Sequence, residues 1–167
     1  GQVAVATTPG AVRRVRLTPA QPAASEAAVQ AIMDADVVTI GPGSWFSSVI
    51  PHILVPDIAQ ALNETSATVA VILNLSPEAG ETHGFTTERH IHVFSQHAPQ
   101  LHVDYFLADE RTATSEGERD NIARAASRLD AEVVFAPLRE LDAAGAPLNR
   151  HDPQQLAAAL KAIRPAR

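Results

Sequence analysis

The sequence predicts an α/β fold built on a doubly wound, Rossmann-like and mostly parallel sheet, with an N-terminal β-hairpin. Four short runs of β-branched and other apolar residues recur along the chain, and stretches with helical spacing precede and separate them. Strands buried on both faces are continuous apolar runs in sequence, so this alternation is typical of a parallel sheet covered by helices. Hydrophobic residues make up 46% of the 167 positions, which is enough for such a core.

Residues 1–18 are predicted to form the hairpin. Val3–Thr8 and Ala11–Leu17 alternate small apolar with polar residues on either side of Pro9-Gly10. Alternation of this kind has the period of a β-strand, and a Pro-Gly pair supplies turn geometry. We therefore expect two antiparallel strands ahead of the main sheet.

Residues 25–137 are predicted to form the βα units of the core. Each apolar run ends at a residue that favours a turn or a loop. The expected strands are Val37–Ile40, Thr68–Leu73, His102–Ala108 and Glu132–Ala136, and the expected helices are Glu26–Met33, Val55–Leu62, Thr87–His97 and Arg119–Leu129. Because ligands of such sheets bind beyond the carboxyl ends of the strands, a site is expected at the strand exits.

A terminal helix is assigned to residues 150–164. Asp152 is expected to cap it, with Pro153 at the first helical position, because an aspartate side chain accepts hydrogen bonds from the first turn. Arg150 stands ahead of this cap. It is either a planar fork for a phosphate or an ordinary surface arginine.

Composition excludes several classes of function. The chain has 13 Lys and Arg residues against 19 Asp and Glu residues, with a formal charge of −6, so it lacks the basic field that grips a nucleic-acid backbone. No apolar run reaches the roughly 18 to 20 residues that cross a bilayer. The absence of cysteine excludes disulfides, thiolate zinc sites and cysteine nucleophiles. No nucleic-acid partner and no membrane span are therefore expected.

The exit of the first strand carries the strongest candidate site. Gly41 and Gly43 permit backbone conformations that let a ligand approach closely, and a helix opening after them would direct free N–H groups at an anion. Ser44, Ser47 and Ser48 add hydroxyl donors suited to phosphate oxygens. The segment is neither a Walker A motif nor a complete G-x-G-x-x-G motif. The alternative is a tight turn between strand and helix with a serine cap.

The exit of the second strand, Asn74–Phe85, is a polar loop that contains glycine. The Asn74 amide can donate and accept, which suits a base or sugar edge, and Glu81 can accept from a hydroxyl or hold a divalent ion. The alternative is that Asn74 ties adjacent loops together and that Glu81 is solvated. The residues alone leave both interpretations open.

Other polar groups are weaker candidates. His90, His92 and His97 lack the four-residue spacing with a further ligand that zinc sites usually have, so a polar helix face is expected and no metal site is assigned. Asp109, at the exit of the third strand, either binds a ribose or a metal or caps the next turn. No catalytic triad or carboxylate pair is evident, so catalytic residues stay unknown.

Three segments together resemble the motifs of one family. They are Ala35–Ile58, which contains Gly41-Pro42-Gly43-Ser44; Asn74–Phe85, which contains Gly80-Glu81-Thr82; and Arg150-His151-Asp152-Pro153. In this order and at this spacing they are similar to the YvcK-like branch of the CofD-like (UPF0052) family, whose members are also called gluconeogenesis factors. The match spans nearly the whole chain.

The resemblance implies a cytoplasmic protein about twice as long as this chain. Members of the family begin with a G-G-G-T-G loop on a first Rossmann strand, and this loop is absent here. The chain is therefore expected to be the C-terminal half of the family fold and to carry half of a ligand cleft. A homo-oligomer is also expected.

The resemblance also implies a function: a regulatory protein that binds a nucleotide sugar, namely a UDP-sugar, and is linked to cell-shape maintenance and growth on gluconeogenic carbon sources. The alternative is a CofD-type 2-phospho-L-lactate transferase, which moves a phospholactyl group from a guanylyl donor onto the deazaflavin precursor Fo. Such an enzyme would use a divalent metal such as Mg²⁺ to offset charge, and no other cofactor is expected. A second alternative is a non-catalytic assembly fragment.

The expected ligand site joins the first two strand exits and the start of the last helix. Its residues are Gly41, Gly43, Ser44, Ser47 and Ser48 for a diphosphate, Asn74, Glu81 and Thr82 for the sugar or base, and Arg150 for a phosphate clamp.

Overall fold

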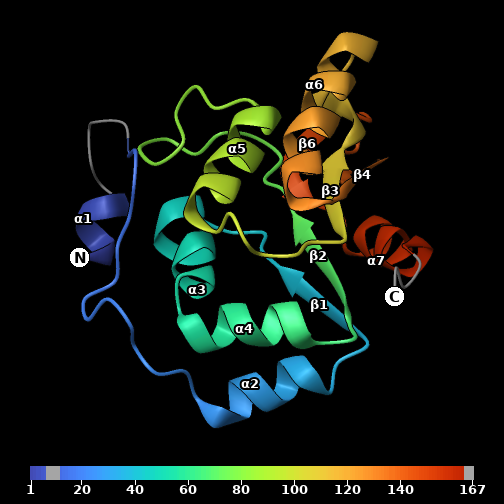
Figure 1. Cartoon of the computed structure of the whole chain (residues 1–167). Helices are drawn as coiled ribbons and strands as arrows, with labels where there is room; N and C mark the ends of the chain where they lie inside the picture. The colour runs from blue at the N-terminus through green and yellow to red at the C-terminus, as the bar shows by residue number, and fades with distance from the viewer. Residues whose placement is uncertain (7–11, 164–167) are drawn as a thin grey trace.

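The computed structural model describes residues 1–6 and 12–163 and has an α/β fold (Figure 1). Its main sheet has four strands in the order β1-β2-β3-β4, and every pair is parallel. The strands are β1 (Val37–Ile40), β2 (Thr68–Ile72), β3 (Tyr105–Asp109) and β4 (Glu132–Ala136). The predicted fold class is confirmed.

Helices precede, connect and follow these strands. They are α1 (Gln2–Ala6), α2 (Glu26–Met33), the π-helix η1 (Trp45–Val49), α3 (Ile50–Ile53), α4 (Pro56–Glu64), α5 (Thr87–His97), the 3₁₀ turns η2 (Glu110–Thr112) and η3 (Ser127–Leu129), α6 (Glu116–Ala126) and α7 (Pro153–Ala162). The ranges expected for α2 and α5 are confirmed to the residue. None of the helices in the described ranges combines the length and apolarity that a membrane span needs.

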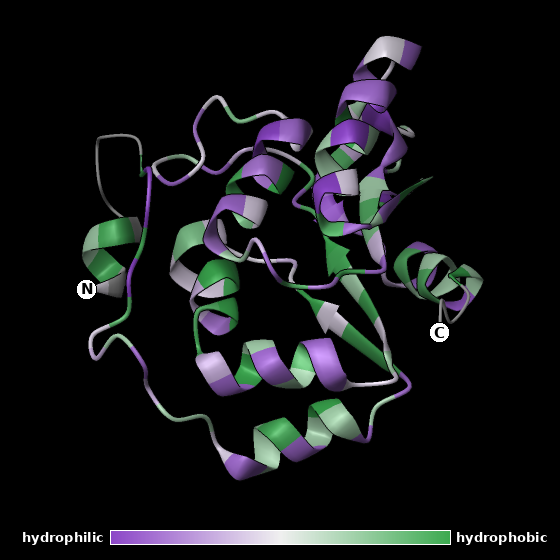
Figure 2. Cartoon of the chain, in the orientation of Figure 1, coloured by the Kyte–Doolittle hydropathy of each residue, from purple (hydrophilic) through white to green (hydrophobic). Residues whose placement is uncertain are grey.

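Both faces of the sheet are covered. Successive side chains of a strand point to opposite faces, so β2 contributes to two separate cores. Val69 and Val71 lie in the larger core with residues of α5 and α6, whereas Ala70 and Ile72 lie in a smaller core with Ala159 of α7. Figure 2 shows the corresponding pattern, a β2 strand that is hydrophobic along its length between helices of mixed character. This double cover explains the continuous apolar run that predicted a buried parallel strand.

The predicted N-terminal hairpin is wrong in the residues that the structure describes. Gln2–Ala6 form helix α1, residues 12–17 form no strand, and residues 7–11 lie outside the described part. In place of a ladder, the Val15 N–H donates to Nε2 of His97 at 3.3 Å. An alternating run becomes a strand only where a partner strand pairs with it, and these residues pack against η1 and α5 instead.

The range 150–164 assigned to the terminal helix begins too early, although the expected first helical position, Pro153, is confirmed. Arg150 belongs to strand β6 (Pro147–His151), which pairs antiparallel with β5 (Arg139–Leu141), and the helix begins at Pro153. The predicted Asp152 cap is confirmed, because its Oδ1 accepts from the N–H groups of Gln154 and Gln155 at 2.8 and 3.1 Å. This small hairpin carries its residues toward the exits of β2 and β3, and so it contributes to the candidate site.

One other boundary has a clear local cause. Helix α6 begins at Glu116, ahead of the expected Arg119, because Ser115 and Glu118 form a capping box in which each side chain binds the other residue's backbone N–H.

Candidate functional site at the strand exits

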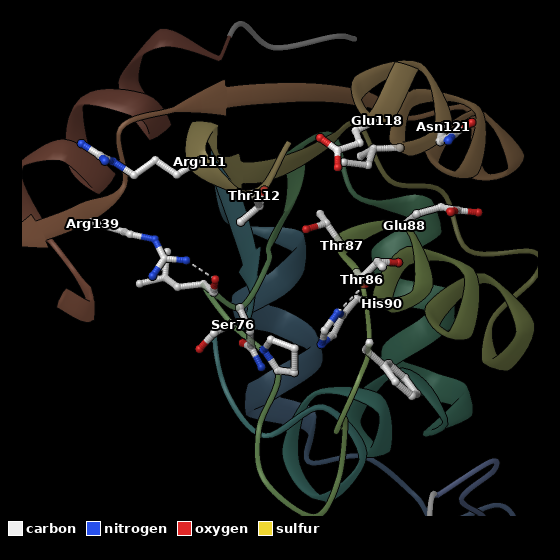
Figure 3. A pocket seen from close by; sticks show the side chains of 15 residues that line it. Ser76, Thr86, Thr87, Glu88, His90, Arg111, Thr112, Glu118, Asn121 and Arg139 are labelled. Atoms are coloured by element: carbon white, nitrogen blue, oxygen red, sulfur yellow. Dashed lines mark hydrogen bonds between the residues drawn. The ribbon is translucent and has the colours of Figure 1, made fainter. Parts of the chain in front are cut away.

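A cavity of about 370 Å³ opens beyond the carboxyl ends of β2 and β3 (Figure 3). Its walls come from the β2 exit, the first turn of α5, η2, α6 and β5. The lining residues are Asn74, Leu75, Ser76, Pro77, Phe85, Thr86, Thr87, Glu88, His90, Arg111, Thr112, Glu118, Asn121, Ile122 and Arg139. The location agrees with the rule that places ligands of parallel sheets at the strand exits. We call this space the strand-exit cavity.

The turn after β1 requires glycine at its first position. Gly41 has φ +81°, and a Cβ built there would lie 2.9 Å from the carbonyl oxygen of Ile72 on the neighbouring strand. A side chain is therefore excluded both by backbone conformation and by space. The role expected of Gly41 in permitting a special backbone path is consistent with this geometry.

The backbone donors that follow this turn are already bound by a side chain of the chain itself. Oε2 of Glu81 accepts from the Phe46 N–H at 2.8 Å and from the Ser47 N–H at 3.2 Å. Glu81 is only 3% exposed, so the expected alternative of a solvated carboxylate is wrong. The start of η1 does attract an anion, as expected of a helix N-terminus, but the anion present is Glu81.

Asn74 forms a second internal contact with the same turn. Its Oδ1 accepts from the Gly43 N–H at 3.2 Å, and its Nδ2 donates to the Gly43 carbonyl at 2.9 Å. Both ends of the amide are used on one residue. This confirms the alternative in which Asn74 ties the first two strand exits together.

Glu78 and Thr82 complete the closed loop beside η1. The Ser44 hydroxyl donates to Oε1 of Glu78 at 3.4 Å, and the buried Thr82 hydroxyl accepts from the Glu78 N–H at 2.8 Å. Burial, followed by the negative charge of Glu81, raises the pKa of Glu78 above its ordinary value. Ser44 and Thr82 are thus joined through Glu78, whereas Glu81 binds the backbone of η1.

Ser47 and Ser48 do not lie on the strand-exit cavity. They line a different cavity, of about 570 Å³, between η1 and the N-terminal segment that contains Arg14 and Arg16. The structure therefore splits the serines that the sequence grouped into one phosphate site.

Arg150 does not line either cavity at the strand exits. Its guanidinium binds the carboxylate of Glu140 on the adjacent strand, and its side chain is 68% exposed. The flanking residues of β6, Asn149 and His151, line a cavity of about 280 Å³ together with Gly43. The alternation of a strand accounts for this, because neighbouring residues point to opposite sides.

Arg139, which lines the strand-exit cavity, pairs with Asp109, which lies behind it outside the lining. Asp109 is 1% exposed; its Oδ1 accepts from Nε of Arg139 at 2.9 Å, and its Oδ2 accepts from the Leu138 N–H at 3.0 Å. Nη2 of Arg139 donates to the Leu75 carbonyl. The sequence offered Asp109 as a ribose or metal ligand or as a cap of the next turn, and the cap is confirmed, because its Oδ1 accepts from the Arg111 N–H at 3.2 Å. Nothing in the sequence marked Arg139, since its contact with Asp109 depends on the β3–β4 register, which places Asp109 opposite Ala136 just ahead of β5.

His90 forms part of the wall nearest α5. It is 3% exposed, and because a carbonyl only accepts, its Nδ1 carries the proton donated to the Thr86 carbonyl at 2.9 Å. Nε2 is then an acceptor, and it is buried without a partner among the described residues. Burial lowers the pKa of His90, with the Thr86 contact opposing it, so the ring is neutral at pH 7.

The described residues do not form a protein-held metal site. Within residues 1–6 and 12–163, no three His, Asp or Glu side chains gather closely enough to hold an ion. Near η1 the oxygen Oε2 of Glu81 is bound by backbone donors, whereas its Oε1 is buried without a hydrogen-bond partner among the described residues. In this part of the chain the carboxylates do not form a ready-made cage for Mg²⁺.

The sequence matches a known protein family and several of its members. The family model described as "2-phospho-L-lactate transferase CofD" matches residues 1–164. The chain belongs to the CofD family. Proteins named "Putative gluconeogenesis factor" are among its relatives: one from Mycobacterium tuberculosis is 55% identical over 163 residues, and one from Mycobacterium leprae is 50% identical over 164 residues. The resemblance expected from the three motifs is confirmed.

The fold of the CofD-family chain also matches a solved structure. A crystal structure of a UPF0052 family member from Bacillus halodurans superposes with a TM-score of 0.77 at 25% identity, covering 96% of this chain and 54% of that one. The chain covers 46% of the Mycobacterium tuberculosis relative and 44% of the Mycobacterium leprae relative. It thus spans about half the length of the relatives that it matches.

Proposed function

We propose that this CofD-family chain forms part of a nucleotide-sugar-binding regulatory protein, with a UDP-sugar as its ligand and the strand-exit cavity as its site. The observation that carries the proposal is the cavity of about 370 Å³ at the exits of β2 and β3. This volume lies in the range of roughly 300 to 1,000 Å³ found for small-molecule sites. Its position is where nucleotides bind to doubly wound sheets.

The lining chemistry supports a polar ligand with several hydroxyl groups. Ser76, Thr87 and Thr112 offer hydroxyls, Asn121 offers an amide, and Phe85 offers an apolar ring face. Hydroxyls and amides both donate and accept, which suits sugar hydroxyls and a pyrimidine edge. The neighbouring cavity of about 280 Å³ shares Asn74–Ser76 with this one, so a ligand longer than one ring has room beside it.

The cellular part of the proposal follows from the relatives. Their name, "Putative gluconeogenesis factor", supports a role in growth on gluconeogenic carbon sources. We extend the proposal to cell-shape maintenance and to a cytoplasmic location, as the resemblance to the YvcK-like branch implies.

Calorimetric titration with UDP-N-acetylglucosamine, GDP and Fo tests the binding proposal. We expect UDP-N-acetylglucosamine to bind in preference to the other two. Asn121→Trp places a large side chain at the cavity wall and is expected to abolish binding, whereas Asp120→Trp, on the same helix but outside the lining set, is expected to retain it. Equal binding by these two variants, or no binding by the unsubstituted protein, contradicts the proposal.

A second candidate is a CofD-type phospholactyl transferase, which the description of the matched family model favours. In that reaction a hydroxyl oxygen of Fo would bond to the phosphorus that carries the lactyl group, and the guanylyl nucleotide would leave with the electrons of the broken P–O bond. Selective GDP binding together with phospholactyl transfer to Fo would establish this candidate over the regulatory one.

A further inference from the structure

Arg139 is held in a fixed position by two protein acceptors. Asp109, whose side chain is 1% exposed, binds its Nε at 2.9 Å, and the Leu75 carbonyl binds its Nη2. Asp109 is itself fixed by the Leu138 N–H on its second oxygen. An arginine restrained in this way has lost most of its side-chain freedom before any ligand binds, which lowers the entropic cost of binding.

The contacts leave part of the guanidinium available. It has five N–H groups in a planar fork, and the contacts with Asp109 and Leu75 use two of them. Nη1 and the second N–H of Nη2 have no hydrogen bond to any residue in the described ranges. These two nitrogens form one edge of the fork, the arrangement that binds two oxygens of a phosphate in parallel. The Arg139 side chain is 15% exposed and lines the cavity.

The opposite wall adds donors of the same kind. Thr87 and Glu88 begin α5, across the cavity from Arg139 in Figure 3. The Thr86 hydroxyl caps only the Arg89 N–H of this turn, and the N–H groups of Thr87 and Glu88 have no partner among the described residues. Free N–H groups and the helix dipole favour an anion here. The guanidinium of Arg139 and the start of α5 therefore both line the strand-exit cavity, and both favour an anion there.

The lining also holds charged groups of both signs, so the cavity is not uniformly positive. Arg111 adds a second cation. Oε2 of Glu118 accepts from the N–H groups of Thr114 and Ser115, so this carboxylate caps the start of α6. Glu88 is exposed, and its carboxylate is free to turn to solvent.

We propose that Arg139 binds the phosphate oxygens of the ligand in the strand-exit cavity, and that Asp109 is the residue that positions it. The proposal rests on the proposed function and deepens it, because it moves the phosphate subsite away from the backbone of residues 41–48. It agrees with two observations. Glu81 occupies the donors of η1, whereas Arg139, whose side chain is 15% exposed, keeps free N–H groups at the cavity. The subsite is specific for a phosphate or diphosphate group.

Titration with inorganic pyrophosphate and with UDP-N-acetylglucosamine tests the subsite. Arg139→Ala is expected to weaken binding of both ligands by about 30-fold, and Arg139→Lys by about tenfold, because lysine keeps the charge but loses the fork. Arg128→Ala is the matched control. Arg128 lies in η3, outside the cavity lining, and contacts His92, so both affinities should stay unchanged.

Asp109→Asn distinguishes positioning from a structural role. Asparagine has the same shape, but its Nδ2 faces a donor, either the Leu138 N–H or Nε of Arg139, so the melting temperature should fall. If Asp109 also positions Arg139, the affinity for pyrophosphate should fall by about tenfold at a temperature where the variant is folded. A fall in melting temperature without a change in affinity would show that Asp109 only stabilises the fold. Arg139→Lys retains the ion pair with Asp109 and serves as the folded reference if Arg139→Ala does not fold.

The two ligands separate the failure of this inference from the failure of the proposed function. If UDP-N-acetylglucosamine binds but Arg139→Lys and Arg139→Ala bind it as tightly as the unsubstituted protein, the phosphate subsite is wrong and the function stands. If pyrophosphate binds through Arg139 and the nucleotide sugar does not bind, the subsite stands and the function is wrong. If Arg150→Ala rather than Arg139→Ala abolishes binding, the clamp lies on the other side of β6, and the inference is overturned. If neither ligand binds, both the subsite and the proposed function are overturned.

Discussion

The turn after β1 and the strand-exit cavity are neighbouring regions that both contain hydrogen-bond donors. They differ in whether the chain itself supplies acceptors for those donors. In the turn, the N–H groups of Phe46 and Ser47 are bound by the buried carboxylate of Glu81. In the cavity, the N–H groups at the start of α5 have no such carboxylate, and Arg139 keeps part of its fork free. A donor predicts a ligand only where the chain does not supply the acceptor itself.

The difference has a simple energetic origin. A buried N–H without an acceptor costs about 1 to 3 kcal/mol, so a donor cluster that is enclosed by the fold needs an internal partner. Glu81, 35 residues from Phe46 along the chain, is that partner. Donors that face open space are hydrated and do not need one. Four substitutions test this contrast.

Glu81→Ala should have the largest effect. It removes the acceptor of two donors at once, and we expect the free energy of unfolding to fall by about 3 kcal/mol, measured by urea denaturation. Glu81→Gln keeps one acceptor oxygen and should cost about 1 kcal/mol. If emptying the turn makes it an anion site, added pyrophosphate should restore part of the lost stability in Glu81→Ala only. Unchanged stability of Glu81→Ala would remove the basis of the contrast.

Gly41→Ala should destabilise the protein by about 2 to 3 kcal/mol, because it combines a strained backbone with a steric overlap. The matched control is Gly84→Ala. Gly84 also has a positive φ, +74°, but nothing lies within 4 Å of the added Cβ, so about 1 kcal/mol of backbone cost is expected. Thermal denaturation of both variants gives the difference, which reports the contact with the Ile72 carbonyl. Equal effects would show that this close approach does not restrict the turn.

Asn74→Ala should cost about 1 to 2 kcal/mol, because both hydrogen bonds with Gly43 are lost at a position shared by the turn and the cavity. Asn74→Asp keeps the acceptor for the Gly43 N–H and loses the donor, so an intermediate loss is expected in the same urea titration. If Asn74→Ala abolished ligand binding while leaving stability unchanged, Asn74 would be a ligand residue rather than a link between the two exits.

Glu78→Gln should have the smallest effect, and its sign depends on pH. Burial and the charge of Glu81 raise the pKa of Glu78 in the folded state, so ionisation opposes folding. The stability that Glu78 contributes is complete at low pH and is lost as the pH rises through its folded-state pKa. Glu78→Gln should therefore raise the melting temperature by about one degree at pH 7.5. The gain should vanish near pH 4, and an equal gain at both values would assign it to packing.

Much of the fold followed from local pattern. The runs at β1 and β4 and the helices α2 and α5 have the ranges expected for them, because β-branched runs and helical spacing are properties of short segments. The β5–β6 hairpin was missed because its strands are short and polar, and no apolar run marks them. The N-terminal alternation predicted a hairpin, but no strand pairs with residues 1–6 or 12–17, the parts of it that the structure describes.

The candidate site was only partly predictable. Gly41, Gly43, Asn74 and Glu81 do gather at the first two strand exits, as parallel strands ending at one edge require. Their contacts with one another were not predictable, because each joins residues more than 30 positions apart in the chain. Arg139 was not predictable for a similar reason, because it reaches Asp109, 30 positions away, through the pairing of β3 with β4.

By itself, the sequence determined the α/β class, the edge of the sheet where polar groups collect and membership of the CofD family, since each depends on local periodicity or on ordered motifs. Only the tertiary structure decided which donors are satisfied. Glu81 closes the turn after β1, Ser47 and Ser48 face another cavity, and Asp109 holds Arg139 beside open space. Satisfaction of a buried polar group is a relation between distant residues, so it is settled when the elements pack.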